Sequence, residues 1–127
     1  MQKKKLYVGC AVHNAPKDFS ENVENLKSTL EDDFEVLRFL GSFEGTADDV
    51  FKHDIDCVRS CDIFLAICDI PSTGLGFEIA SALAWGKRVI GVAQRESSVS
   101  RMVIGIDDPN FTFVRYTSFD DIRSLLK

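Results

Sequence analysis

A wholly apolar run, Ile63–Cys68, constrains the fold of this chain more than any other segment. A strand with no polar face is typical of the centre of a parallel sheet, where helices bury both faces. Parallel strands also need long crossover connections, which are usually helices. We therefore expect strands and helices to alternate along the chain.

The sequence does alternate in this way over its 127 residues. Apolar or alternating runs predict strands, and apolar residues at helical spacing, such as Phe19, Val23 and Leu26, predict helices. Together they predict a single α/β domain over residues 1–127, Rossmann- or flavodoxin-like, with a doubly wound five-stranded parallel sheet and helices on both faces. The predicted strands are Leu6–Val12, Phe34–Leu40, Asp62–Cys68, Arg88–Ala93 and Phe111–Tyr116, and the predicted helices are Asp18–Glu31, Ala47–Ser60, Gly76–Trp85, Ser97–Ile104 and Phe119–Leu126.

Charge and hydropathy exclude several classes of function. The net charge of -5 argues against nonspecific binding of nucleic acid, which needs a basic surface. No apolar run approaches the length of a membrane span. The apolar run Leu6–Val12 behind the basic start is too short for a signal peptide. We expect a cytoplasmic protein that binds neither nucleic acid nor membranes.

The four cysteines favour buried, reduced thiols over a metal site. They include no CxxC pair, and they do not combine with His13 or His53 at a zinc-binding spacing. We expect no metal and no cofactor. A cysteine nucleophile is an alternative, because Cys10 and Cys68 both stand at ends of predicted strands and could line a pocket.

The segment that follows the apolar run carries the best candidate site. Ligands bind at the carboxyl ends of strands in such sheets, and here a loop with Gly74 and Gly76 leads into a predicted helix. The glycines allow close approach of a ligand, and a helix N-terminus attracts anionic oxygens. We expect Glu78 in the first helical turn, ionised by the helix dipole and able to act as a nucleophile or base. Alternatively, Glu78 only stabilises the helix.

Asp54 is a second candidate acid. It shares one face of its predicted helix with Val50 and Cys57, which makes an unpaired carboxylate there costly. Partial burial would raise its pKa and suit it to donate a proton. The alternative is a surface acid that pairs with Lys52 or Arg59.

Four further residues stand near the predicted carboxyl edge or in the first strand. The hydroxyls of Ser72 and Thr73 suit a phosphate or a sugar hydroxyl, and they are equally common as helix caps. Tyr7 lies on the first strand as either a core or a site residue. Asp69 is a reserve acid at the ligand end of the third strand, whereas Asp62 at its other end is expected to be structural.

The loop and its surroundings resemble the nucleoside 2-deoxyribosyltransferase superfamily, and within it the deoxynucleoside 5'-monophosphate N-glycosidases. The similar segment is Asp54-x7-Asp62, an apolar strand and then PSTGLGFEIASALAWGKRVIGV. The N-glycosidase branch reads P-S-x-G-x-G-x-E-x-(G/A), which Pro71, Ser72, Gly74, Gly76 and Glu78 match in register, with an aspartate 24 residues before the glutamate.

This resemblance implies a covalent mechanism on a small-molecule substrate, a nucleotide or a nucleoside. Glu78 would attack the anomeric carbon of the sugar, and Asp54 would protonate the departing base. Tyr7 matches a tyrosine that touches the catalytic carboxylate. Ser72 matches a phosphate-binding serine, where transferases of free nucleosides carry an aspartate. Ser100 matches a serine that reaches the phosphate of a neighbouring subunit, which implies a homodimer or a higher homo-oligomer.

The first strand departs from the phosphate-specific pattern. The Gly-Ser and the arginine that follow the tyrosine in that branch are absent, and the spacing of Gly9 resembles the nucleoside-specific enzymes. His13 or Asn14 could donate to a phosphate instead. We expect an N-glycosidase of nucleoside 5'-monophosphates. The alternatives are base exchange between nucleosides, NAD cleavage by a TIR-like domain, and a nucleotide sensor without catalysis.

Overall fold

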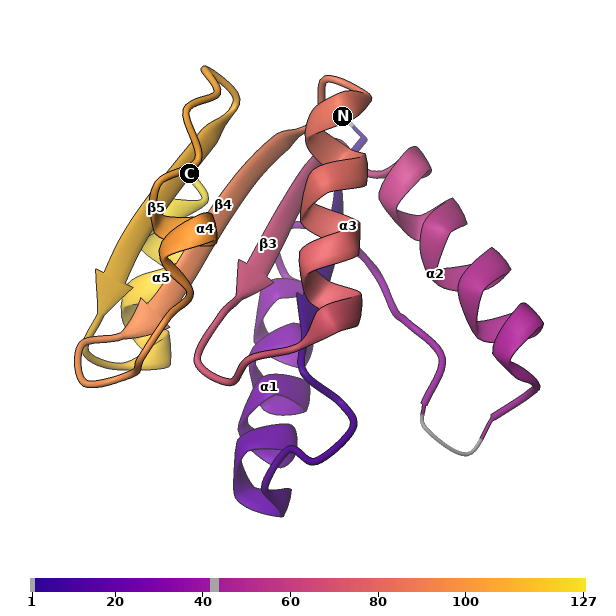
Figure 1. The fold of residues 1–127 in the computed structure, drawn as a ribbon, viewed down its shortest axis with the longest axis horizontal. Helices are drawn as coiled ribbons and strands as arrows, with labels where there is room; N and C mark the ends of the chain where they lie inside the picture. The colour runs from indigo at the N-terminus through magenta and orange to yellow at the C-terminus, as the bar shows by residue number, and fades with distance from the viewer. Residues whose placement is uncertain (1, 42–43) are drawn as a thin grey trace.

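The computed structural model describes residues 2–41 and 44–127. Its strands form the expected parallel sheet, in the order β2-β1-β3-β4-β5 (Figure 1). The strands are β1 (Lys5–Cys10), β2 (Glu35–Leu37), β3 (Ile63–Ile67), β4 (Arg88–Gln94) and β5 (Phe111–Tyr116), and the helices are α1 (Lys17–Leu30), α2 (Ala47–Ser60), α3 (Thr73–Ala84), α4 (Arg101–Ile104) and α5 (Phe119–Leu125).

Each face of the sheet has its own hydrophobic core. Alternate residues of β1 divide between the two: Leu6 packs on the side of α1 and α5, whereas Tyr7 packs on the side of α2 and α3. Figure 1 accordingly shows α2, α3 and α4 in front of the sheet and α1 and α5 behind it. All residues of β3 are buried, which confirms the central, doubly covered strand that its apolar run predicts.

The order of the strands creates a crevice between β1 and β3. The chain moves from β1 outward to β2, then returns to the opposite side of β1 to form β3. Helices that leave the two halves of such a sheet diverge at this point, and ligands bind there, beyond the carboxyl ends of the strands. The N-terminal end of α3 stands beside this crevice, since α3 follows β3 directly.

Most predicted elements are confirmed, and two keep their predicted bounds, α2 and β5. A reciprocal cap fixes the start of α2: the Thr46 hydroxyl accepts from the Asp49 N–H at 3.2 Å, and the Asp49 carboxylate accepts from the Thr46 N–H at 3.0 Å. Strand β2 is shorter than predicted: at the edge of the sheet, only Glu35–Leu37 pair with β1. Residues 42 and 43, in the segment that connects β2 to α2, lie outside the described residues.

The start of α3 differs from the prediction, which placed it at Gly76. The helix begins at Thr73, because the Ser72 side chain caps it by accepting from the Leu75 N–H at 3.2 Å. Gly74 and Gly76 therefore belong to the helix and not to a loop. Helix α4 likewise begins at Arg101 and not at Ser97. Its cap is Ser100, whose hydroxyl accepts from the Met102 N–H.

Candidate active site

A cavity of about 490 Å³ opens between α2 and α3, beyond the carboxyl end of β1. It contains the three residues that the family resemblance assigns to catalysis. Tyr7 comes from β1, Asp54 from α2 and Glu78 from α3, so three elements that are distant in sequence bring them to one cavity. The structure therefore places Asp54 on the same side of the sheet as Glu78, as its helical face predicts.

Tyr7 and Glu78 form a direct pair. The Tyr7 hydroxyl donates to the Glu78 carboxylate at 2.6 Å, and the ring of Tyr7 is fully buried against Phe64 of the neighbouring strand. Burial and the adjacent carboxylate raise the pKa of Tyr7 well above its ordinary range, so the phenol stays protonated. This hydrogen bond orients the carboxylate and favours its charged form.

The expected ionisation of Glu78 by the helix dipole is wrong. Because α3 begins at Thr73, Glu78 is the sixth residue of the helix and lies beyond the first turn, where the dipole acts. Burial dominates and raises the pKa of Glu78 to about 7 against the hydrogen bond from Tyr7, and the charge of Asp54 raises it further. Near neutral pH the carboxyl can thus change its protonation state.

Asp54 is partly buried at the cavity wall and anchored to the backbone. Its carboxylate accepts from the Leu40 N–H at 2.9 Å, and burial raises its pKa despite that hydrogen bond. Within residues 2–41 and 44–127 it forms no ion pair, and Arg59 pairs with Asp56 at 3.6 Å instead. The raised pKa fits the expected proton donor better than the alternative of a paired surface acid.

The structure adds a buried cation that the sequence reasoning missed. The side chain of Lys27 on α1 is only 1% exposed. Its ammonium lies 2.8 Å from the Glu24 carboxylate and 3.7 Å from the centre of the Phe39 ring. Its positive charge lowers the pKa of both Asp54 and Glu78, in opposition to burial. The position of Lys27 on the apolar stripe of its helix, four residues after Val23, was the signal available in the sequence.

Other predicted residues surround the mouth of the cavity. Ser72, Gly74 and the exposed His13 all line it. Two aromatic rings that the sequence analysis did not single out, Phe51 and Phe77, also line it from opposite helices; each is 54% exposed, and their centres lie 5.9 Å apart. A planar heterocycle could pack against such rings.

The cysteine alternative loses support. Cys10 lines the cavity, and burial raises its pKa to about 11, which keeps the thiol protonated and weakly nucleophilic at neutral pH. Cys68 lines a different pocket, and burial raises its pKa to about 12.

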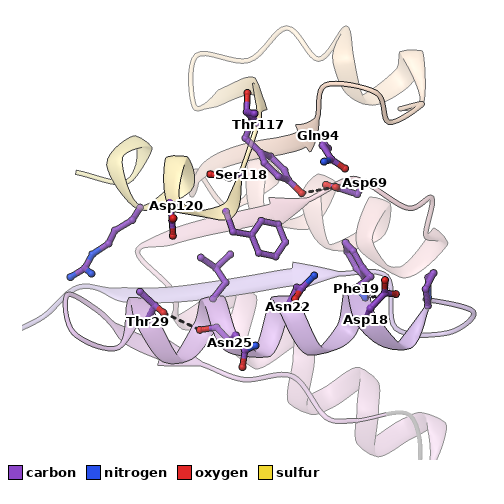
Figure 2. A pocket seen from close by; sticks show the side chains of 15 residues that line it. Asp18, Phe19, Asn22, Asn25, Thr29, Asp69, Gln94, Thr117, Ser118 and Asp120 are labelled. Carbon is purple, nitrogen blue, oxygen red and sulfur yellow. Dashed lines mark hydrogen bonds between the residues drawn. The ribbon is translucent and has the colours of Figure 1, made fainter.

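Four predicted site residues lie outside this cavity. Gly9 is buried, and a Cβ there would approach the Phe64 ring to 2.7 Å, so its role is close packing. Gly76 and Ser100 line a neighbouring pocket of about 430 Å³ between α3 and α4, which Ser72 also borders. Asp69 faces the opposite side of the sheet, where it accepts from the Tyr116 hydroxyl (Figure 2).

Asp62 has the structural role that the sequence predicts. Its carboxylate accepts from the Lys5 N–H at 2.8 Å, at the opposite edge of the sheet from the cavity. Across residues 2–41 and 44–127, no group of three or more acidic, histidine or cysteine side chains is arranged to hold a metal ion. In the same ranges, no helix has the length and apolar character that crossing a bilayer requires.

Because Glu78 is partly buried, we predict that acidification stabilises the protein. Its pKa of about 7 in the folded chain exceeds the ordinary value of 4.5, so the folded state binds this proton more tightly. The resulting stabilisation is full below pH 4.5 and is lost as the pH rises through 7, with a magnitude of about 3 kcal/mol. We expect urea denaturation to give a larger free energy of unfolding at pH 5 than at pH 8.

The matched control is Glu78→Gln, which cannot titrate at this position. Its free energy of unfolding should vary less between pH 5 and pH 8 than that of the unmodified protein. Parallel pH dependences for the two proteins would contradict the raised pKa of Glu78 in the folded chain.

Comparison with known proteins identifies the family of this chain. Residues 9–115 match the profile of the nucleoside 2-deoxyribosyltransferase family. Proteins from Thermofilum pendens and Syntrophotalea carbinolica, each provisionally named 2'-deoxynucleoside 5'-phosphate N-hydrolase 1, are 44% identical over 78 residues and 33% identical over 89. The alignments cover 60% and 68% of this chain. The chain spans 54% and 61% of the lengths of these relatives.

Solved structures share the fold over almost the whole chain. A CMP N-glycosidase from Clostridium botulinum superposes with a TM-score of 0.73 at 24% identity and covers 97% of this chain and 98% of its own. A 2-deoxyribosyltransferase from Leishmania mexicana superposes with a TM-score of 0.69 at 17% identity, covering 97% and 96%. At such identities the superpositions establish the α/β fold, and the profile match establishes the lineage. This chain therefore belongs to the nucleoside 2-deoxyribosyltransferase family.

Proposed function

We propose that this chain is an N-glycosidase that cleaves the base–sugar bond of a nucleoside 5'-monophosphate, with water as the final acceptor. The observation that carries the proposal is the convergence of Tyr7, Asp54 and Glu78 in one cavity at the carboxyl edge of the sheet. A nucleophilic carboxylate and a separate acid are the two groups that a retaining glycosidase requires. The names of the relatives, which describe nucleotide N-hydrolases, agree with this substrate class.

In the first step, the Glu78 carboxylate attacks C1' of the sugar. The bond from C1' to the base nitrogen breaks, its electron pair leaves with the base, and Asp54 supplies the proton that neutralises the departing base. This step requires a reactive state that holds the proton on Asp54 and the charge on Glu78. The hydrogen bond from Tyr7 supports that distribution, because it stabilises the charged form of Glu78.

In the second step, water hydrolyses the glycosyl ester. The Asp54 carboxylate, which has lost its proton, accepts one from water as the water oxygen bonds to C1'. Glu78 leaves as a carboxylate, the free sugar phosphate forms, and both side chains return to their initial protonation states. If another nucleobase takes the place of water, the same site performs base exchange.

Ser72 is the proposed contact to the 5'-phosphate. Its oxygen accepts from the Leu75 N–H, so the hydroxyl proton is free to be donated to a ligand in the cavity that Ser72 borders. An aspartate at this position would repel a phosphate, whereas a serine donates to it. The exposed His13 at the same mouth is a second possible donor.

The test is a panel of nucleosides and their 5'-monophosphates, deoxy and ribo, assayed by chromatography for released base. We expect free base and sugar phosphate from the monophosphates. An added second base that appears in a new nucleoside would indicate transfer, release of nicotinamide from NAD would indicate the TIR-like reaction, and binding without turnover would indicate a sensor. Each of those results would overturn the proposed hydrolysis.

Replacing Ser72 with aspartate should shift the preference from monophosphate to free nucleoside. Aspartate caps helices as well as serine does, so α3 should keep its start. The added negative charge beside the phosphate should lower kcat/KM for the monophosphate roughly 10- to 100-fold relative to the nucleoside. Ser72→Asn, which can cap the helix without adding charge, is the control, and an unchanged ratio in Ser72→Asp would exclude Ser72 as the phosphate contact.

We also propose that the protein works as a homodimer or a higher homo-oligomer in the cytoplasm. Large apolar side chains on α3 and α4 are exposed: Phe77 (54%), Met102 (85%) and Ile104 (43%). A second copy would bury them and would lie beside the pocket that Ser100 lines. The four free, buried cysteines are consistent with a reducing compartment.

A further inference from the structure

A second, larger hollow lies on the face of the sheet opposite the active-site cavity. It has a volume of about 740 Å³ and runs between α1 and α5 over the carboxyl ends of β3, β4 and β5. In Figure 2, Asp69 and Gln94 at the strand ends face Asn22 of α1 across this groove. No step of the proposed reaction uses this α1–α5 groove.

The floor of the α1–α5 groove carries the carboxylate of Asp69. The Tyr116 hydroxyl donates to Oδ2 of Asp69 at 2.5 Å. The other oxygen, Oδ1, is buried, and no atom of residues 2–41 and 44–127 makes a hydrogen bond of good geometry to it. Burial raises the pKa of Asp69, although Tyr116 and the nearby Gln94 backbone N–H oppose this. A cation bound beside this carboxyl would favour its charged form, which burial disfavours.

The charges around the groove have one predominant sign. Asp18 and Asp120 join Asp69 in its lining, and its single cation is Arg123. The Arg123 guanidinium is already engaged outside the groove, at 2.7 Å from the Asp33 carboxylate and 3.8 Å from that of Asp32. The groove therefore presents unbalanced negative charge to a ligand.

Aromatic rings supply the apolar part of the lining. Phe119 packs against Tyr116 with ring centres 5.3 Å apart, and Phe19 of α1 lines the same groove from the other wall. Aromatic faces attract cations as well as alkyl chains. A ligand that carries positive charge at N–H groups and a short hydrocarbon chain matches both the charge and the rings.

We propose that the α1–α5 groove is a second ligand site, for a small organic cation of the alkylamine class. One ammonium group of the ligand lies beside the Asp69 carboxylate at the floor of the groove, and the alkyl chain packs between Phe19 and Phe119. The side-chain carbonyls of Asn22 and Gln94 are available as further acceptors along the groove. The proposed ligand has no glycosidic bond, so we assign binding to this groove and not a second glycosidase reaction.

The test is an NMR titration of the whole protein with 1,4-diaminobutane, with 1,4-butanediol as an uncharged probe of the same length. We expect the diamine to shift the backbone and side-chain amide signals of Asn22, Gln94 and Tyr116, and the diol to leave them in place. Shifts spread over the acidic surface, equal shifts with the diol, or no shifts at millimolar diamine would each overturn the proposal. This map needs no variant.

A charge-matched pair of variants tests the role of Asp69. Asp69→Asn should weaken diamine binding about tenfold or more, since it replaces a charged acceptor by a neutral one. Asp107→Asn removes the same charge from an exposed position outside the groove and should bind as the unmodified protein does. Equal weakening in both variants would show that only the net charge matters and would refute the site. Base release is not part of either measurement, so the outcome is independent of the proposed glycosidase.

Discussion

Glu78→Gln is expected to lower the rate of base release by at least about 10³-fold. The amide retains the size of the side chain and can still accept the hydrogen bond from Tyr7, but it cannot form a glycosyl ester. The folded state should persist, because the substitution removes a carboxyl whose burial raises its pKa to about 7 and therefore disfavours its charge. Single-turnover base release and thermal denaturation, measured on the same preparation, separate the two effects.

Glu21→Gln is the matched control for this experiment. Glu21 lies on α1, its side chain is 61% exposed, and it pairs with Lys17 at 3.8 Å, far from the cavity lining. Both its activity and its melting temperature should match the unmodified protein. If Glu78→Gln keeps a rate within tenfold of the original, Glu78 is not the nucleophile, and the assignment of the cavity as a glycosidase site fails with it.

A small nucleophile should restore part of the activity to a shortened side chain. Glu78→Ala leaves a space next to C1' in which azide can act in place of the carboxylate, while Asp54 still protonates the base. The expected product is a glycosyl azide. A recovery of the rate without azide in the product would assign Glu78 an electrostatic role instead of a covalent one.

Local patterns were sufficient to predict the fold and the side of the sheet on which the site lies. The helical offsets from Val50 to Asp54 and Cys57 put the acid on the buried face of α2, and the apolar run of β3 identified the central strand. Both predictions depend on a pattern of apolar and polar residues that recurs along the whole length of a helix or strand. They are robust to errors of one or two residues at the ends.

Long-range contacts explain what the sequence could not predict. Asp69 stands at the ligand end of its strand as expected, yet its side chain pairs with Tyr116, 47 residues later, on the face away from Glu78. Lys27 is buried because Glu24 and the ring of Phe39 compensate its charge, and Phe39 belongs to a segment beyond the next strand. The contact of Asp69 with Tyr116 and the contact of Lys27 with Phe39 do not follow from a local pattern.

The protonation of Glu78 shows how a small error at a helix end changes the chemistry. An expected start at Gly76 put Glu78 among the free N–H groups of the first turn, where the dipole would favour its charge. The Ser72 cap moves the start to Thr73, and burial then decides the pKa. The site consequently depends on Tyr7, and not on the helix N-terminus, to stabilise the carboxylate.

Asp54→Asn is expected to lower base release roughly 10²- to 10⁴-fold, the range that general acid catalysis contributes. The amide oxygen can still accept from the Leu40 N–H, so the segment that lines the cavity should keep its place. Asp56→Asn is the matched control: it lies two residues away on α2, its side chain is 73% exposed, and it pairs with Arg59. That variant should retain full activity.

The loss in Asp54→Asn should depend on the leaving base. A base that is a weak proton acceptor departs readily without protonation, so it needs the acid less, and 5-fluorouracil should therefore be released with a smaller loss than uracil. This dependence distinguishes a proton donor from a residue that merely holds the Leu40 backbone, because a structural defect would slow both substrates by the same factor. Equal losses for the two bases would show that Asp54 is not the proton donor. The next candidates would be Cys10 and His13, which line the same cavity.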